Sequence, residues 1–586
     1  MRTRFPARTA ALLLALGSCT PEDPQTRDRV AATPVTAPVA AIAPDAWTAF
    51  RDRFVATWFA LDPAFAVYQG RHEHDGGLPD WSADGLGRQA AFLHRSIAAA
   101  GRFETAALSP EQRFERDYLM MVARDKLFWL EAADAPHRNP AWYVAGGLDP
   151  NVYVVRAYAD PVRRMRALIA LLRRIPAATL QIRANLATPM PISHVDYAAN
   201  AFRGFASYYM DDSVKAFAGV ADEGLQRELA DAAMTASEAM RDLALWVEAQ
   251  RPTATRSFAL GPALFAKMLR ETEGVDTPIA TLEAAGRADL ARNQRALAAA
   301  CAQFAFGLTV RDCLAQVNAD KPVDGPVAEA RRQIPMLRAF IVRRDLLTLA
   351  GNEQALVEES PPYSRQRSRL YRSAGSVRSR RAVGLLHLAA RPRWTQAVRD
   401  AFVPGKADLL FTSIHEAMPE HFVHFLHANR VPSLIGRVFV GYGYAEGWAH
   451  YAEEMMWEAG LGGGRADIHI GQLSNALLRD CRFLAAIGMH ARGMTQAEAF
   501  TLFVDQCYQD EGNARQQALR GTYDPAYLNY TMGKLMIRRL RQDWTAGRGG
   551  RRAWKAFHDR LLRYGGPPIP LVRQAMLGEP RPIAAF

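Results

Sequence analysis

Two histidines and a glutamate near residue 415 are the residue types that zinc peptidases use. His415 is followed directly by Glu416, and His421 lies six residues after the first histidine. Two imidazoles can bind one metal ion, and an adjacent glutamate can take a proton from water that the metal activates. The usual pattern, H-E-x-x-H, separates its histidines by four residues so that both lie on one helical face. The spacing in this sequence is two residues longer.

Pro419 decides whether the longer spacing can still form a site. On a regular helix His421 would lie about 240° around the axis from His415. Proline lacks the N–H that would bond to the carbonyl of His415, and its ring clashes with that carbonyl. We therefore predict a break in the helix that returns His421 to the metal. His424 and His427 follow, and His424 is either a competing ligand or a partner behind the ligands.

A carboxylate from a second helix is expected to complete the metal site. Glu446 lies 25 residues after His421, which is enough chain for the rest of one helix, a turn and the start of an antiparallel helix. His450 and Glu453 follow at spacings that keep them on the same helical face as Glu446. Three protein ligands would leave one position of a tetrahedral zinc ion open to water. From these residues alone, a polar surface helix remains the alternative.

These segments resemble the paired motifs of the domain-of-unknown-function 885 family, whose members are largely exported bacterial proteins. Residues 415–421 are similar to its HExxPGH motif, and residues 446–453 are similar to its EGWAxYxE motif. The motifs occur in the family's order, and the resemblance covers about residue 46 to the C-terminus. Further similar segments lie at residues 62–70, 488–490 and 525–534.

The resemblance implies a zinc peptidase with one Zn²⁺ ion and a large helical fold similar to that of the thimet oligopeptidase type. It makes Glu416 the general base. Tyr530 and His490 are expected to polarise the scissile carbonyl and stabilise the oxyanion. For each of these two, a buried side chain with an ordinary hydrogen bond is the alternative. The family's metal ligands correspond to His415, His421 and Glu446.

The sequence departs from the family pattern beside the expected ligands. Glu420 stands where the family has the glycine before the second histidine, and Phe422 stands where it has a further histidine. A glycine that adopts a left-handed turn cannot become glutamate without strain. We therefore expect Glu420 to alter the bend and its carboxylate to bind or repel substrate. A catalytically inactive member of the family is the alternative.

Hydrophobic periodicity predicts a mainly α-helical fold that positions these residues. Met165, Leu168, Ile169 and Leu172 form one stripe at i, i+3, i+4 and i+7, between two prolines. Further helices are expected at residues 222–250 and 278–306, and a capping box at Thr495 and Glu498.

Evidence for strands is thin. Residues 142–144 and 152–155 are short β-prone runs, so a few short strands are expected. Breaks rich in proline or charge at residues 321–325 and 358–381 are expected to be loops rather than links between domains. We therefore predict one large helical catalytic domain over residues 46–586.

The N-terminus has the features of a bacterial lipoprotein signal. Three arginines precede a short apolar stretch that ends at Leu16-Gly17-Ser18-Cys19. We predict a signal peptide over residues 1–18, lipidation of Cys19, and a tether rich in proline and alanine over residues 19–45. An ordinary secretory signal is the alternative. Both would export the protein, to the periplasm or the outer membrane.

The composition is typical of a folded globular protein and excludes disordered, collagen-like and multi-spanning membrane chains. Of 586 residues, 49% are hydrophobic and 23% are charged, and the net charge is +12. The basic residues are spread along the chain without a nucleic-acid motif, so no nucleic-acid partner is expected. An arginine-rich cleft would favour acidic peptides or a free C-terminal carboxylate. The sequence says nothing of oligomeric state.

Beyond Cys19, an even number of cysteines allows two disulfides in three connectivities, or buried free thiols. These are Cys301, Cys313, Cys481 and Cys507. The favoured function is a zinc-dependent peptidase that hydrolyses peptide bonds in the periplasm or cell envelope. The alternatives are a non-catalytic helical lipoprotein that binds a peptide or envelope component, and a metal-dependent hydrolase of another amide or ester.

Overall fold

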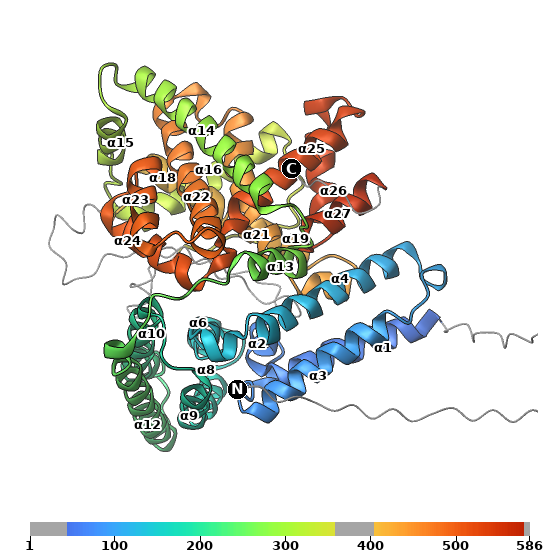
Figure 1. Ribbon diagram of the computed structural model, residues 1–586, viewed down its shortest axis with the longest axis vertical. Coiled ribbons are helices and arrows are strands. Elements are labelled where there is room, and N and C mark those ends of the chain that lie inside the picture. Colours follow the sequence, from blue (N-terminus) through green and yellow to red (C-terminus); the bar gives the residue numbers. More distant parts are fainter. Residues whose placement is uncertain (1–43, 358–402, 579–586) are drawn as a thin grey trace, which may run out of the picture. The chain divides into compact units, whose positions relative to one another are not determined.

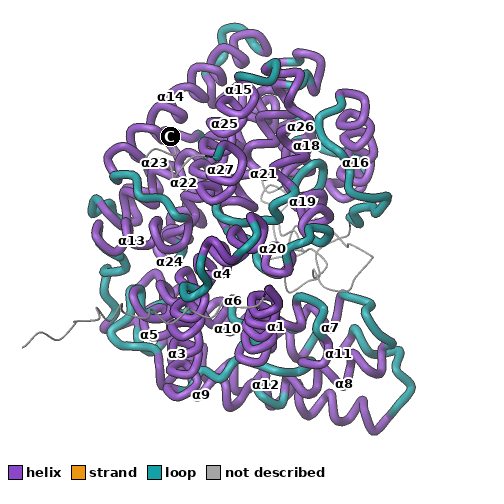
Figure 2. Tube along the Cα trace, turned by 90° about the vertical axis from the view of Figure 1, so that its right-hand side faces the viewer, coloured by secondary structure: helices purple, strands orange, loops and turns teal. Residues whose placement is uncertain are grey.

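The computed structural model describes residues 44–357 and 403–578. Helices and loops make up these ranges (Figures 1 and 2), and no strand occurs within them. The closest approach to a sheet is an isolated bridge between Pro191 and Thr255. The prediction of a mainly helical fold is therefore confirmed. Three sequence features lie outside the described residues: the signal peptide and tether, Cys19, and the break at 358–381.

The predicted short strands are wrong, because both runs lie in helices. They are α6 (Ala141–Ala145) and α7 (Asn151–Val155). Tyr143 is buried and its hydroxyl donates to the carbonyl of Pro136 at 2.7 Å. Tyr153 is also buried, and its hydroxyl accepts from the N–H of Gly76 at 2.8 Å. Such tertiary contacts outweigh the weak β propensity of runs only three or four residues long.

Helices in the first part of the described chain share one hydrophobic core. Met165, Leu168, Ile169 and Leu172, the stripe predicted from periodicity, all point into it and are at most 3% exposed. The helices are α1 (Pro44–Leu61), α2 (Pro63–Tyr68), α3 (Ala83–Ala100), α4 (Pro110–Leu127), α5 (Ala135–Arg138), α6, α7, α8 (Pro161–Leu172), α9 (Ile175–Asn185), α10 (Ile192–Met210), α11 (Asp212–Lys215) and α12 (Glu223–Glu248).

The later helices surround a second and larger core. The predicted capping box is present at the start of α23, where Thr495 and Glu498 bond reciprocally. These helices are α13 (Pro262–Glu273), α14 (Ile279–Phe304), α15 (Val310–Ala319), α16 (Gly325–Arg344), α18 (Lys406–Glu416), α19 (His421–Ala428), α21 (Tyr442–Glu458), α22 (Ala466–Ala491), α23 (Gln496–Cys507), α24 (Glu511–Tyr523), α25 (Asn529–Ala546), α26 (Trp554–Leu562) and α27 (Ile569–Leu577). The short helix α20 (Leu434–Val438) follows α19 in the chain but packs into the first core.

The two cores belong to one compact unit that begins at Ala43. Helix α4 joins them, because the buried hydroxyl of Tyr118 lies 2.7 Å from the carbonyl of Phe439 and 3.1 Å from that of Gly566. Ile435, Val438 and Phe439 come late in the chain, yet they pack into the first core. The break at 321–325 only connects α15 to α16 and does not divide the cores.

Helices α21 and α25 cross at two glycines that belong to the motifs noted in the sequence. A Cβ atom on Gly447 would lie 2.4 Å from the Cα atom of Gly533, and one on Gly533 would lie 2.1 Å from the carbonyl oxygen of Gly443. No larger residue fits at this distance, so glycine is required for the close approach. The crossing brings Glu446 of α21 and Tyr530 of α25 to the same part of the core.

Two disulfides each join a pair of helices that follow one another in the chain. Cys301–Cys313 connects α14 to α15, and Cys481–Cys507 connects α22 to α23. This is one of the three connectivities that the sequence allowed. Within the described ranges, no helix is both long enough and apolar enough to cross a membrane.

Candidate metal centre

The predicted break at Pro419 is present. Helix α18 ends at Glu416, the chain leaves helical geometry at Ala417 (φ −131°, ψ −62°), and α19 begins at His421. His415 therefore lies in the last turn of one helix and His421 in the first turn of another. The interruption removes the angular offset that a continuous helix would impose.

His415, His421 and Glu446 converge. The Nε2 atom of His415 lies 3.2 Å from Glu446 Oε2, and the Nε2 atom of His421 lies 3.5 Å from the same oxygen. One ligand atom from each of the three side chains lies within 4.8 Å of the others, and in the described part of the chain only these residues form such a group. Each comes from a different helix: α18, α19 and α21.

The geometry of this group fits a zinc ion. Donors at about 2.0–2.2 Å from a tetrahedral ion are about 3.3–3.6 Å apart, close to the two separations measured here. Glu446 Oε2 is buried but has no hydrogen-bond partner, although it lies near both rings. Two imidazoles and one carboxylate are also a donor set that zinc accepts with a fourth position open.

Glu453 orients the His415 ring through Nδ1, the ring nitrogen that does not contact Glu446. Its Oε1 atom lies 2.7 Å from His415 Nδ1 and 3.0 Å from an Nη atom of Arg479. With the Nδ1 proton donated to this carboxylate, Nε2 keeps its lone pair for a metal. Such carboxylate–histidine pairs orient the ligand and increase its basicity. The alternative that these acidic residues form a solvated surface is excluded, because Glu453 and Glu454 are both buried.

The charges around the ligands shift their titration. Burial raises the pKa of Glu446, but interactions with His421 and His415 outweigh it and hold that pKa well below its usual range. Burial and Arg479 lower the pKa of His415, whereas interactions with Glu446 and Glu453 raise it, to about 9. At neutral pH Glu446 is therefore ionised and the His415 ring is protonated, so a metal ion that binds Nε2 of His415 would displace its proton.

Glu416 is positioned beside the ligands without being one of them. Its side chain is buried, and it interacts electrostatically with His415, His421 and Glu446. Burial raises its pKa, and the histidines lower it in part. A carboxylate with a raised pKa can both accept and return a proton near neutral pH.

Tyr530 stacks beside the His415 ring. The two rings are nearly parallel, with centroids 6.1 Å apart. Burial and Glu446 raise the pKa of Tyr530, while Arg520 and Arg482 lower it. The net shift is upward, so the phenol keeps its proton at neutral pH and remains a hydrogen-bond donor.

The other predicted histidines lie away from the ligand group. Both ring nitrogens of His490 contact backbone groups: Nδ1 lies 3.3 Å from the N–H nitrogen of Leu260 and Nε2 lies 2.7 Å from the carbonyl of Gly521. His424 Nε2 lies 2.6 Å from the carbonyl of Gly565. For His490 the structure favours the alternative of an ordinary buried histidine over a catalytic role. His450 is buried behind the site, with Nδ1 3.5 Å from a Glu453 oxygen.

The expectation of strain at Glu420 is wrong. Its φ of −86° lies outside the left-handed region, so the turn does not require glycine. The Glu420 side chain is fully buried, and its influence on substrate stays a prediction. Neither carboxylate oxygen has a hydrogen-bond partner, and burial, followed by the charge of Glu453, raises its pKa well above the usual range.

Sequence reasoning missed the arginines beside the site. Arg479 and Arg482 lie on α22 and are buried, and Arg520 on α24 donates to the Tyr442 hydroxyl at 2.7 Å. A signal was available for the first two. They interrupt the apolar face of a helix that is buried over most of its length, and charged residues in such a position are rarely buried without a partner.

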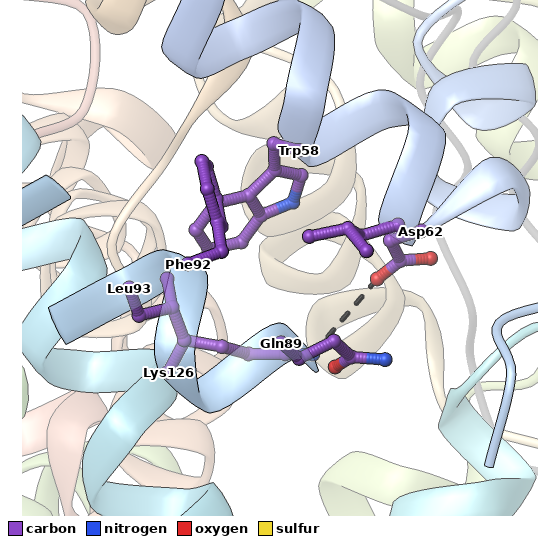
Figure 3. A pocket seen from close by; sticks show the side chains of 7 residues that line it. Trp58, Asp62, Gln89, Phe92, Leu93 and Lys126 are labelled. Atoms are coloured by element: carbon purple, nitrogen blue, oxygen red, sulfur yellow. Dashed lines mark ion pairs between the residues drawn. The ribbon is translucent and has the colours of Figure 1, made fainter. Parts of the chain in front are cut away.

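A separate pocket of about 240 Å³ lies in the first core between α1, α3 and α4 (Figure 3). Trp58, Phe92 and Leu93 line it with other side chains. Lys126 Nζ lies 3.8 Å from an Asp62 oxygen there. None of the metal-group residues lines this pocket.

Comparisons with known proteins show which family and which solved structures this chain is similar to. A family model described as "Bacterial protein of unknown function (DUF885)" matches residues 63–576. No curated protein matches the sequence. A "putative lipoprotein of unknown function" from Shewanella oneidensis is 23% identical with a TM-score of 0.74, over 91% of this chain and 99% of that one. A "putative lipoprotein" from Colwellia psychrerythraea is 14% identical with a TM-score of 0.76, over 91% and 98%. At these identities, the similarity to the two structures shows only that this chain has the same fold.

Proposed function

This chain belongs to the bacterial DUF885 family of unknown function, and from that premise we propose that it is a zinc-dependent peptidase of the cell envelope. The observation that carries the proposal is the convergence of His415, His421 and Glu446, with Glu416 beside them. The separations of Glu446 Oε2 from the Nε2 atoms of His415 and His421 suit one zinc ion, and the position of Glu416 suits a general base.

The reaction follows from the placement of the side chains. A zinc ion held by the three ligands would act as a Lewis acid toward a peptide carbonyl and would lower the pKa of water. Glu416 accepts a proton from the attacking water and later delivers it to the leaving amine. Tyr530 donates a hydrogen bond to the oxyanion that develops on the carbonyl. Glu453 keeps His415 in the tautomer that leaves Nε2 free to bind.

The cell envelope is proposed from the N-terminus. An arginine-bearing n-region, a short apolar stretch and Cys19 are the parts of a lipoprotein signal. Both relatives carry the description "putative lipoprotein", which supports the same location for this chain. A lipid on Cys19 would anchor the protein, and the tether at 19–45 would separate the helical unit from the membrane.

Metal analysis and one substitution test the proposal. The purified protein should bind one equivalent of zinc and hydrolyse peptides in a mixed peptide library, as seen by mass spectrometry. Glu416→Gln should retain the zinc while turnover falls by orders of magnitude, because a base is lost and no ligand is. Glu223→Gln, at a side chain that is 95% exposed, is the matched control and should keep full activity.

Two results would overturn parts of this proposal. Protein without stoichiometric zinc that gains no hydrolysis when zinc is added would favour the non-catalytic lipoprotein. Loss of zinc in Glu416→Gln would show that the roles of Glu416 and a ligand are misassigned. Zinc-dependent turnover of esters or other amides, without peptide cleavage, would instead identify a hydrolase of another class.

A further inference from the structure

Arg482 is a buried cation that has no acidic partner among the described residues. Its side chain belongs to a residue that is 8% exposed, and its Nε atom donates to Gln517 Oε1 at 2.8 Å. No carboxylate in the described ranges forms an ion pair with it. The other buried cations around the site are paired, as Arg479 is with Glu453 and Lys534 is with Asp289.

Arg482 lies next to the candidate metal centre. Its guanidinium carbon lies 4.8 Å from the centroid of the Tyr530 ring, which is itself 6.1 Å from the His415 ring. On α22, Arg482 follows one turn after Arg479, which contacts Glu453 behind His415. The contacts with Gln517 and Tyr530 fix the guanidinium group and leave its terminal N–H donors without a hydrogen bond to any described residue.

The charge on Arg482 persists in this environment. Burial and the neighbouring Arg520 lower its pKa, but only to about 10, so the group stays protonated at neutral pH. An unpaired charge in a buried position costs several kcal/mol relative to a paired one. Arg520 is compensated by Asp524 at 2.8 Å. Arg482 is therefore a site of uncompensated positive charge beside Tyr530.

We propose that Arg482 binds a carboxylate group of the substrate. The planar guanidinium group offers parallel donors that match the two oxygens of a carboxylate. The ligand is either the C-terminal carboxylate of a peptide, which would make the protein a carboxypeptidase, or an acidic side chain near the scissile bond. This inference names a substrate class for the proposed peptidase and rests on that proposal.

Binding to a protein that cannot turn over tests the inference. In Glu416→Gln, calorimetry would compare N-acetyl-tetra-alanine as the free acid and as the amide, with and without one equivalent of Zn²⁺. A second set of amidated peptides would carry Glu or Gln at each position in turn. We expect the carboxylate-bearing member of one set to bind about 10- to 100-fold more tightly. The set that discriminates identifies the source of the carboxylate.

Substitutions of Arg482 then assign the effect. In the Glu416→Gln background, Arg482→Met should abolish the preference, and Arg482→Lys should retain part of it because the charge remains but the paired donors do not. Arg515→Met removes an exposed guanidinium group from α24 and should leave the preference unchanged. Circular dichroism and thermal unfolding would show that each variant is folded.

Two outcomes would overturn the inference: no discrimination in either peptide set, or discrimination that persists in folded Arg482→Met. Failure of the proposed function is a different result. A protein that never cleaves peptides but loses carboxylate preference with Arg482 would retain the binding site and lose the peptidase assignment. A protein that cleaves peptides with no preference for a carboxylate in either set would retain the peptidase assignment and lose the binding site.

Discussion

The burial of Glu273 predicts that the free energy of unfolding depends on pH. One substitution at this residue should remove its contribution. This residue of α13 is 2% exposed, and its Oε1 atom accepts from the N–H of Gly443 at 3.0 Å and from the Asn529 amide at 2.6 Å. The other oxygen, Oε2, is buried with no hydrogen-bond partner. Burial raises the pKa of Glu273 to about 8, although the bond from Gly443 opposes the rise. At neutral pH the folded protein therefore carries this carboxyl in its neutral form.

The size and sign of this effect on the free energy of unfolding follow from the pKa values of Glu273 in the unfolded and folded states. In the unfolded chain Glu273 ionises near 4.5, and in the folded protein it ionises near 8. Between these values the folded state holds a proton that the unfolded state has released, so stability falls as pH rises. A difference of about 3.5 pH units, at about 1.4 kcal/mol for each, gives a loss of at most about 5 kcal/mol. Glu273→Gln is neutral at every pH and keeps an acceptor for Gly443 and Asn529.

Denaturant unfolding followed by circular dichroism between pH 5 and pH 8.5 measures the effect. The variant and the parent should have similar stability at pH 5, and the variant should become progressively more stable above it, by up to about 5 kcal/mol. Asp125, with a pKa raised to about 6 by burial, and Tyr118 lie near Glu273. Both remain in the variant, so their titration cancels in the difference. If the free energy of unfolding changed with pH in the same way for the parent and the variant, the argument would be refuted.

Two further predictions concern the packing and orientation of the site. Glu453→Gln should weaken zinc binding about 10- to 100-fold, as measured in competition with a chromophoric chelator. Glu458→Gln, further along the same helix, is the control and should not weaken it. Equal zinc affinities of the two variants would contradict the role of Glu453. Gly447→Ala would place a Cβ atom 2.4 Å from Gly533 and should lower the free energy of unfolding by about 1–3 kcal/mol. Gly87→Ala, at an exposed position of α3 where a Cβ atom would meet nothing within 4 Å, should instead stabilise the protein by about 0.5–1 kcal/mol. A Gly447→Ala protein as stable as its parent would exclude the close crossing.

Local rules predicted the helices well because their signals are local. The stripe in α8 and the capping box of α23 depend on residues within one or two turns, and both are present. The runs in α6 and α7 were assigned to strands because their propensity is weak, and because the contacts of Tyr143 with Asn185 and of Tyr153 with Gly76 come from distant residues. The sequence does not show such contacts.

The candidate ligands were predictable because each belongs to a short motif with its own spacing. Pro419 also showed where the helix must break, from its missing N–H alone. The conformation of Glu420 was not predictable in this way. A glycine in a related motif suggests a left-handed turn, but the φ of −86° at this position shows that another geometry closes the bend. Arg482 was missed because its significance depends on the absence of a carboxylate nearby, which only the packed structure shows.

Two neighbouring glutamates on α21, Glu453 and Glu454, connect the charged centre to the helices around it. Glu453 points to His415, whereas Glu454 accepts from Arg292 of α14 at 3.0 Å and lies 3.9 Å from Lys534 of α25. Helix α22 is connected to α21 through Arg479, whose guanidinium group lies 3.0 Å from a Glu453 oxygen. Removing one member of such a buried network leaves another charge uncompensated, at a cost of about 3–5 kcal/mol. The helices that carry the candidate ligand Glu446, Tyr530 and Arg482 are thus fixed relative to one another by charge pairing, so the relative positions of these three residues do not depend on a bound metal or substrate.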